Sequence, residues 1–164
     1  MFLQRTPPEP GQESVWDYPR PPRLEKTDKK ITVVFGGITI AETFYAKRLL
    51  ETSHPPVYYI PHSDIKTEHL IATPKASWCE WKGRATYYTI TAGDKQAENA
   101  AWGYAAPNPT FALIQDHVAF YPHMMDACYV DRELVQPQAG DFYGGWITSD
   151  IVGPFKGMPG TMGW

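Results

Sequence analysis

Two runs of β-forming residues on either side of Gly36-Gly37 constrain this chain more than any other local feature. Residues 31–35 and 38–41 are rich in Ile, Val and Thr. Two adjacent glycines readily adopt the positive φ angles of a tight hairpin turn. A second turn of this kind is expected at residues 92–95, which contain Gly93-Asp94. The sequence therefore predicts two β-hairpins, and hairpins join antiparallel strands.

Other segments predict more strands and one helix. Strands are expected over residues 57–60, 86–91, 96–102, 117–121 and 127–130. Residues 43–51 predict a short helix, because four apolar residues share its length and Thr43 suits an N-cap. Residues 63–71 fit a helical turn that runs into a short strand. Sixteen prolines and thirteen glycines also favour many turns and short elements, so we expect a mainly antiparallel β fold.

The N-terminal thirty residues differ in composition from the rest. They hold six prolines and a basic run from Arg20 to Lys30, which favour extended backbone over helix. Trp16 and Tyr18 would gain by packing on a core. We expect a flexible tip over residues 1–12, a Pro-rich basic arm that docks over residues 13–30, and one β-rich domain over residues 31–164. The basic run is interpreted as a solvated linker, with anion binding as the alternative.

Composition limits the classes of function. A net charge of -3 gives no general attraction for nucleic acid, and no apolar run is long enough for a membrane helix. Two cysteines and five histidines show no metal-ligand spacing, so neither a metal nor a cofactor is expected. The first residues lack the apolar region of a signal peptide, and a cytoplasmic location is expected. The sequence leaves open whether the chain forms a homodimer.

The stretch from Ser77 to Tyr88 is the strongest candidate for the rim of a pocket. It combines two tryptophans, a thiol, a carboxylate and two cations within twelve residues, with Gly83 breaking the run. Apolar walls with a few placed charges are typical of small-molecule sites. The alternative is a turn entering a strand, with the tryptophans in the core and Lys82 in water.

Four residues are candidates for chemistry. Arg48 and Glu51 are three apart in the predicted helix and would share one face, where Arg48 orients the Glu51 carboxylate for proton transfer. The alternative is a surface ion pair of little energetic value. Lys82 lies among aromatic residues, which would lower its pKa or let it stabilise an anion. Cys79 is either a nucleophile or a buried free thiol.

Several blocks of the chain, in order, resemble the motifs of the domain of unknown function 427 family. The blocks are Arg48-Leu49-Leu50-Glu51-Thr52-Ser53-His54-Pro55-Pro56, Tyr58-Tyr59-Ile60-Pro61, Cys79-Glu80-Trp81-Lys82-Gly83, Glu98-Asn99-Ala100-Ala101-Trp102-Gly103-Tyr104, Phe142-Tyr143-Gly144-Gly145-Trp146 and Val152-Gly153-Pro154-Phe155-Lys156-Gly157. The family often has proline where this chain has Glu80, which loosens that turn.

The resemblance implies antiparallel β-sheets packed as a tent-like or sandwich-like single domain with one or two short helices. Its motif residues correspond to Arg48, Glu51, Tyr58, Cys79, Lys82, Trp102 and Tyr104. The family also carries a nucleotidyltransferase-like label. The residues give that label no support, because no Asp-x-Asp or Asp-x-Glu pair follows Gly36-Gly37 to hold magnesium.

These observations lead to one functional prediction and two alternatives. The chain is expected to be a cofactor-free acid–base enzyme for a small apolar or aromatic organic molecule, catalysing isomerisation, cyclisation, dehydration or hydrolysis with Glu51 and Lys82. The expected walls of the pocket are Tyr58, Trp81, Tyr88, Trp102, Tyr104 and Tyr121. A non-catalytic module that binds a small molecule is the first alternative, and nucleotidyl transfer is the second.

Overall fold

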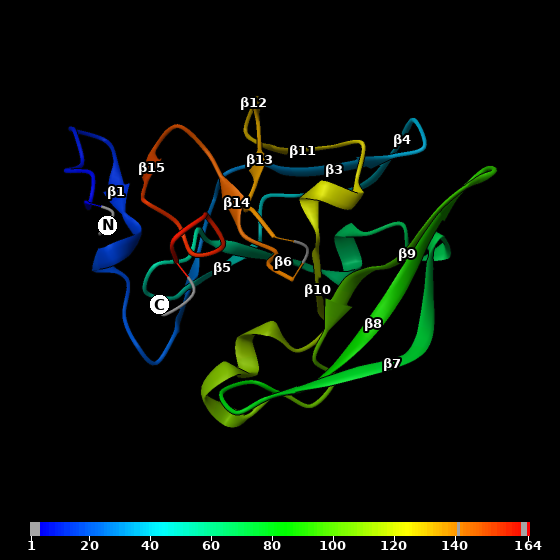
Figure 1. Cartoon of the computed structure of the whole chain (residues 1–164). Helices are drawn as coiled ribbons and strands as arrows, with labels where there is room; N and C mark the ends of the chain where they lie inside the picture. The colour runs from blue at the N-terminus through cyan, green and yellow to red at the C-terminus, as the bar shows by residue number, and fades with distance from the viewer. Residues whose placement is uncertain (1–3, 141, 162–163) are drawn as a thin grey trace.

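The computed structural model describes residues 4–140, 142–161 and 164, and the chain in these ranges is mainly β-strand (Figure 1). This confirms the predicted fold class. The large sheet has the order β2-β5-β6-β10-β9-β8-β7, formed by Arg23–Lys26, Lys47–Leu50, Val57–Pro61, His117–Phe120, Lys95–Gly103, Gly83–Ala92 and Leu70–Cys79. The small sheet has the order β12-β11-β3-β4, formed by Glu133–Leu134, Ala127–Val130, Ile31–Phe35 and Ile38–Thr43.

Short elements complete the described part of the chain. A parallel pair joins β1 (Glu13–Ser14) to β15 (Ile151–Val152), and an antiparallel pair joins β13 (Gln136–Pro137) to β14 (Trp146–Ile147). The helical segments are 3-10 turns: η1 Val15–Asp17, η2 His62–Asp64, η3 Thr67–His69, η4 Pro109–Ile114 and η5 Pro122–Met124. None of the helices in the described ranges is long and apolar enough to cross a membrane.

Both predicted hairpins are confirmed. Strands β3 and β4 are antiparallel and joined at Gly36 and Gly37, whose φ angles are 60° and 75°. Strands β8 and β9 are antiparallel and joined at Gly93, with φ of 59°. A Cβ on Gly36 would lie 2.6 Å from the Cβ of Ala92, so the two hairpins meet closely at this glycine.

The predicted helix over residues 43–51 is wrong, and the segment contains strand β5. This strand lies between β2 and β6 and pairs with both. Both of its faces are covered: Leu49 packs in an aromatic cluster on one side, and Leu50 packs with Val15 and Ile151 on the other. Because a strand buried on both faces carries consecutive apolar residues, its pattern resembles that of a short helix.

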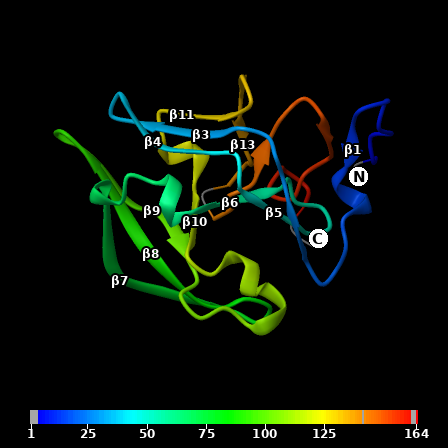
Figure 2. The ribbon, with the colours of Figure 1, turned by 180° about the vertical axis from the view of Figure 1, so that it is seen from behind.

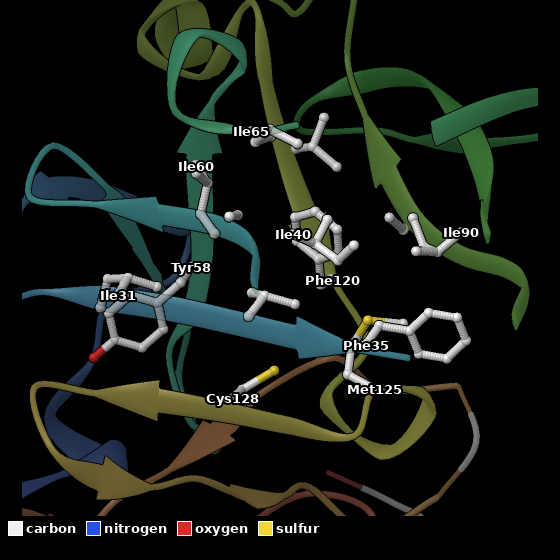
Figure 3. Packing of buried hydrophobic residues seen from close by; sticks show 14 of the residues in the cluster. Ile31, Phe35, Ile40, Tyr58, Ile60, Ile65, Ile90, Phe120, Met125 and Cys128 are labelled. Carbon is white, nitrogen blue, oxygen red and sulfur yellow. The ribbon is translucent and has the colours of Figure 1, made fainter. Parts of the chain in front are cut away.

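The main core lies between the large and small sheets. Its fully buried members include Ile31, Phe35, Ile40, Ile60, Ile90 and Phe120 (Figure 3). Trp146 also has no exposed surface, and its indole N–H donates to the Phe120 carbonyl at 3.2 Å. Trp146 therefore anchors the C-terminal loops to the main core.

The opposite face of the large sheet carries a second cluster that is rich in aromatic residues. It contains Leu49, Tyr59, Ala85, Tyr87, Trp102, Tyr104, Ala119, Phe111 and Ile114. The last two come from η4, whose yellow-green loop lies beside the β7–β8 turn in both views (Figures 1 and 2). Neighbouring residues of one strand therefore face different clusters, with Tyr58 in the main core and Tyr59 in the outer one.

The N-terminal segment packs along the C-terminal loops. Val15 is fully buried, and the Trp16 indole N–H donates to the Pro154 carbonyl at 3.0 Å. The Trp16 ring contacts that of Trp164, with centroids 4.7 Å apart. Of the expected flexible tip, residues 1–3 lie outside the described residues, whereas the Thr6 amide donates to the Gly153 carbonyl at 2.9 Å. Part of the expected arm, β2, is a strand of the large sheet.

Candidate functional site

A cavity of about 310 Å³ opens on the outer face of the large sheet, and we call it the outer cavity. Its described lining residues are Leu49, Glu51, His54, Pro55, Val57, Tyr59, Lys82, Trp102, Gln138, Phe142, Tyr143, Gly144 and Lys156. They come from strands β5, β6 and β9, from the β5–β6 loop, from the β7–β8 turn and from the C-terminal loops. Its walls are mostly aromatic and apolar, with a few charged groups, as is typical of small-molecule sites.

The outer cavity brings together the predicted acid and cation. Glu51 directly follows β5, and Lys82 lies in the β7–β8 turn. The loop before η4 holds that turn, because the Asn108 amide donates to the Lys82 carbonyl at 3.1 Å and its side chain donates to the Trp81 carbonyl at 2.8 Å. Within the described residues, neither Glu51 nor Lys82 has an ion-pair partner. A carboxylate and an ammonium group are therefore both available to a ligand.

The turn that carries Glu51 is held from two sides. The His54 amide donates to the Glu51 carbonyl at 3.0 Å, which closes the turn. The Ser53 amide donates to the Val15 carbonyl at 3.0 Å, and the Lys156 amide donates to the Ser53 carbonyl at 2.8 Å. Ser53 has φ of 73°, a left-handed conformation that is uncommon for serine. The N-terminal segment and the C-terminal loop thus position the Glu51 side of the cavity.

His54 is a site residue that the sequence analysis missed. The Gln138 side chain accepts from the Gly145 amide at 3.1 Å and donates to the Lys156 carbonyl at 2.7 Å, which sets its amide orientation. Its NH₂ group therefore donates to His54 Nδ1, 3.2 Å away. A ring whose Nδ1 accepts a hydrogen bond carries its proton on Nε2. Burial lowers the pKa of His54, so the histidine remains neutral and acts as an N–H donor.

Tyr59 forms part of the cavity wall and also lies deep in the aromatic cluster. It has no exposed surface, and its hydroxyl has no hydrogen-bond partner among the described residues. Burial raises its pKa far above the ordinary value for tyrosine. The Trp102 ring packs edge-on against Tyr59 with centroids 6.4 Å apart, and the Tyr104 ring lies at the same distance. Lys82 Nζ lies 5.6 Å from the Tyr104 ring centroid.

Lys156 places a second cation at the outer cavity. Its ammonium donates to the carbonyls of Thr161 at 3.1 Å and Trp164 at 2.6 Å. Its Val-Gly-Pro-Phe-Lys-Gly segment belongs to the blocks that carry the family resemblance, which is the one sequence signal that could have found it. Nothing in the local sequence indicates that residue 156 meets Glu51, because more than a hundred residues separate them.

Arg48 and Tyr58 lie in a different place, so Arg48 does not orient Glu51 as predicted. Residues 48 and 51 lie three positions apart along extended chain, and they line different cavities. Arg48 and its cross-strand neighbour Tyr58 line a cavity of about 780 Å³ beside the N-terminal segment, which we call the arm cavity. The predicted set of site residues is thus divided between two cavities.

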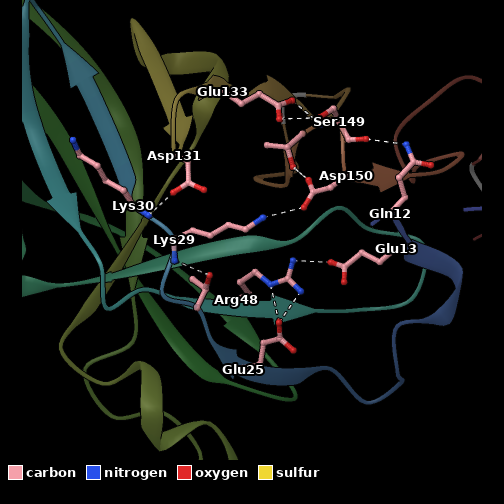
Figure 4. Close-up of polar contacts among 12 residues, drawn as sticks. Gln12, Glu13, Glu25, Lys29, Lys30, Arg48, Asp131, Glu133, Ser149 and Asp150 are labelled. Carbon is pink, nitrogen blue, oxygen red and sulfur yellow. Dashed lines mark hydrogen bonds and ion pairs between the residues drawn. The ribbon is translucent and has the colours of Figure 1, made fainter. Parts of the chain in front are cut away.

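Arg48 links two carboxylates in the arm cavity (Figure 4). Its guanidinium donates to Glu13 at 2.6 Å and to Glu25 at 2.7 and 3.0 Å, and its side chain is 11% exposed. Burial raises the pKa of the Glu13 carboxyl, but hydrogen bonds from Arg48 and Tyr18 outweigh burial and leave that pKa below its ordinary value. With its donors engaged by strand β2 and by β1, Arg48 holds the N-terminal segment in place.

Trp81 and Tyr121, which were predicted as pocket walls, are not among the described lining residues of the outer cavity. Trp81 is 38% exposed in the β7–β8 turn and does not line the cavity, and the nearby Trp78 is 74% exposed. The alternative that these tryptophans are core residues is therefore wrong. The Tyr121 ring packs against the Trp102 ring, with centroids 4.5 Å apart.

Tyr88 and Cys79 also lie outside the described lining of the outer cavity. Tyr88 packs against the main core, on the opposite face of the large sheet from Tyr87. Cys79 is a half-buried free thiol at the end of β7, and it is not among the described lining residues of the outer cavity. No group of three or more His, Cys, Asp or Glu side chains in the described ranges is arranged to hold a metal ion.

Comparison with family profiles matches residues 23–131 to a domain of unknown function, DUF427. The match spans more than half of the 164 residues. The chain belongs to the DUF427 family. This confirms the resemblance seen in the sequence, and a search of curated proteins found no match. The matched region contains Glu51, His54 and Lys82. Gln138 and Lys156, which also line the outer cavity, lie C-terminal to the matched region.

Proposed function

We propose that this DUF427 protein is an acid–base enzyme that acts on a small apolar or aromatic organic molecule in the outer cavity. One observation carries the proposal: a carboxylate and an ammonium from separate segments, neither ion-paired with another described residue, line one aromatic-walled cavity. These parts suit isomerisation, cyclisation, dehydration or hydrolysis, which all need a proton to move while negative charge develops on oxygen. We place the activity in the cytoplasm, where both cysteines remain thiols.

Each group has a distinct role in the proposed chemistry. Glu51 takes a proton from a carbon next to a carbonyl group and returns it at another position. Lys82 and the Nε2–H of His54 stabilise the enolate oxygen that forms. Gln138 keeps His54 in the tautomer that donates at Nε2. Trp102 and Tyr143 provide apolar walls that exclude water and strengthen these electrostatic interactions.

The two alternatives make different demands on the outer cavity. A binding module needs its aromatic walls and charges but no proton transfer, so it predicts that a ligand is recovered unchanged. Nucleotidyl transfer needs paired carboxylates for magnesium, and Glu51 is the one acidic side chain among the described lining residues. We therefore rank acid–base catalysis first and simple binding second.

Exchange of carbon-bound hydrogen in D₂O tests the proposal. Phenylpyruvate and aryl ketones are incubated with the full chain, and loss of the α-hydrogen signal is followed by NMR. We expect exchange above the buffer rate, with Glu51→Gln lowering it by about 100-fold or more, the usual contribution of a general base. Lys82→Met should also slow exchange, with the melting temperature nearly unchanged.

Two exposed residues outside the cavity lining provide matched controls. Glu80→Gln removes an exposed carboxylate from the same turn as Lys82, and Lys66→Met removes an exposed cation elsewhere. Both variants should retain the wild-type exchange rate. If Glu51→Gln exchanges as fast as wild type, Glu51 is not the base. If the probes bind but return without exchange, the binding module is the better account.

A further inference from the structure

The outer cavity has an unequal charge balance. Its described lining contains two lysines, Lys82 and Lys156, and one carboxylate, Glu51. Because the walls are mostly apolar, the field of these charges is screened less than it would be at the open surface. The Lys156 ammonium already donates to two carbonyls, so an uncharged ligand would leave the Lys82 ammonium as the cation without a partner among the described residues.

The hydrogen-bonding groups of the cavity favour the same kind of ligand. His54 Nε2–H and the Lys82 ammonium are donors that make no hydrogen bond to other described residues. The Gln138 side chain uses both of its N–H donors on His54 and Lys156, and its oxygen accepts from the Gly145 amide. Glu51 is the main acceptor in the cavity. A ligand with acceptor oxygens therefore fits better than one with several donors.

The size and walls of the cavity restrict what carries the charge. About 310 Å³ is at the lower end for ligand pockets and suits a molecule with a single ring. Trp102 packs tightly against the C-terminal loop, since a Cβ on Gly144 would lie 2.3 Å from its ring. Tyr143 packs against the His54 ring with centroids 5.6 Å apart. The ring of a ligand would lie between these aromatic side chains.

From this combination we infer that the outer cavity selects a small aromatic monocarboxylate. In a 2-oxo acid the carboxylate and the adjacent carbonyl oxygen both lie toward Lys82 and His54, so the same donors serve the enolate oxygen of the proposed reaction, and the ring lies against Trp102. A phosphate dianion fits less well, because Glu51 repels it and no arginine of the described lining offers a bidentate fork. The inference rests on the same cavity as the proposed function and adds the class of its substrate.

Calorimetry with two isosteric probes, benzoate and benzamide, tests the inference on the full chain. We expect benzoate to bind at least 10-fold more tightly than benzamide. Lys82→Met should weaken benzoate binding by 10-fold or more and leave benzamide unaffected. Glu51→Gln should tighten benzoate binding several-fold, because it removes the like charge. Lys66→Met and Glu80→Gln serve as controls and should change neither affinity.

Three results would overturn the inference: equal binding of the two probes, no effect of Lys82→Met, or inorganic phosphate competing as well as benzoate. The outcome is separable from that of the proposed function. Selective benzoate binding with Glu51-independent exchange supports the anion site and contradicts catalysis by Glu51. Glu51-dependent exchange with equal binding of benzoate and benzamide supports catalysis by Glu51 and contradicts the anion site.

Discussion

Removing the Tyr59 hydroxyl should stabilise the protein, which is unusual for a change in a core side chain. This hydroxyl is buried and has no hydrogen-bond partner among the described residues. A buried polar group in that state costs about 1–3 kcal/mol relative to its hydration in the unfolded chain. Tyr59→Phe removes that cost and keeps the ring, so its contacts with Trp102 and Tyr104 remain.

The expected size of the effect follows from two opposing terms. The substitution recovers the desolvation cost and leaves a void of one atom, which costs on the order of a few tenths of a kcal/mol. The net gain in the free energy of unfolding is therefore about 1–2 kcal/mol. For a chain of this length, each kcal/mol raises the melting temperature by about 2–4 °C. Tyr59→Phe should thus melt about 2–8 °C above the wild type.

Tyr18 provides a matched control of opposite sign. Its hydroxyl is also largely buried, but it donates to the Glu13 carboxylate at 2.7 Å. Hydrogen bonds to charged groups contribute about 1.5–3 kcal/mol, and the lower end applies because the Glu13 side chain is 40% exposed. Tyr18→Phe should therefore destabilise the protein by about 1–2 kcal/mol. Urea denaturation followed by tryptophan fluorescence measures both variants under the same conditions.

The reasoning is refuted if Tyr59→Phe loses stability as Tyr18→Phe does. That result would mean that the Tyr59 hydroxyl is hydrogen-bonded in solution, with the Trp102 indole and the Tyr104 hydroxyl as its nearest candidates. If Tyr59→Phe is more stable but binds ligand more weakly, the Tyr59 hydroxyl contributes to ligand binding at a cost in stability.

Three further predictions concern the arm cavity, the pH dependence and the cavity wall. Arg48→Met should lower the free energy of unfolding by about 2–3 kcal/mol. This is less than for a fully buried ion pair, because the Glu13 and Glu25 side chains are 40% and 38% exposed. The benzoate affinity measured by calorimetry should stay unchanged. The pKa of His54 is lowered by burial, so the unfolded chain takes up its proton first as the pH falls below about 6.5, and stability then declines. His54→Asn should reduce this slope in urea titrations between about pH 5 and 7, with a residual slope from His117, whose pKa burial also lowers. Gly144→Ala should shift the fluorescence of Trp102 and weaken ligand binding, because its Cβ would lie 2.3 Å from that ring; an unchanged spectrum and affinity would contradict the packing described.

Two wrong predictions, the helix over residues 43–51 and the pairing of Arg48 with Glu51, share one cause. The apolar residues of 43–51 suggested a helix, and on a helix Arg48 and Glu51 would have shared a face. The segment is instead a strand between two others, and each of its faces packs against different residues. Leu49 and Leu50 are both buried for this reason, and residues 48 and 51 line separate cavities. A single sequence does not show whether one or both faces of a strand are covered.

The sequence by itself determined the features that depend on near neighbours. The turns at Gly36-Gly37 and Gly93-Asp94, with the strand-forming runs beside them, specified the hairpins, because turn geometry and strand propensity act over a few residues. The ordered motifs specified the family. Only the tertiary structure decided that Glu51, His54, Lys82 and Lys156 line one cavity. These residues come from loops and turns whose meeting depends on how the sheets pack and on where the N-terminal segment and C-terminal loops lie. Those contacts join residues far apart in the chain, and no local pattern encodes them.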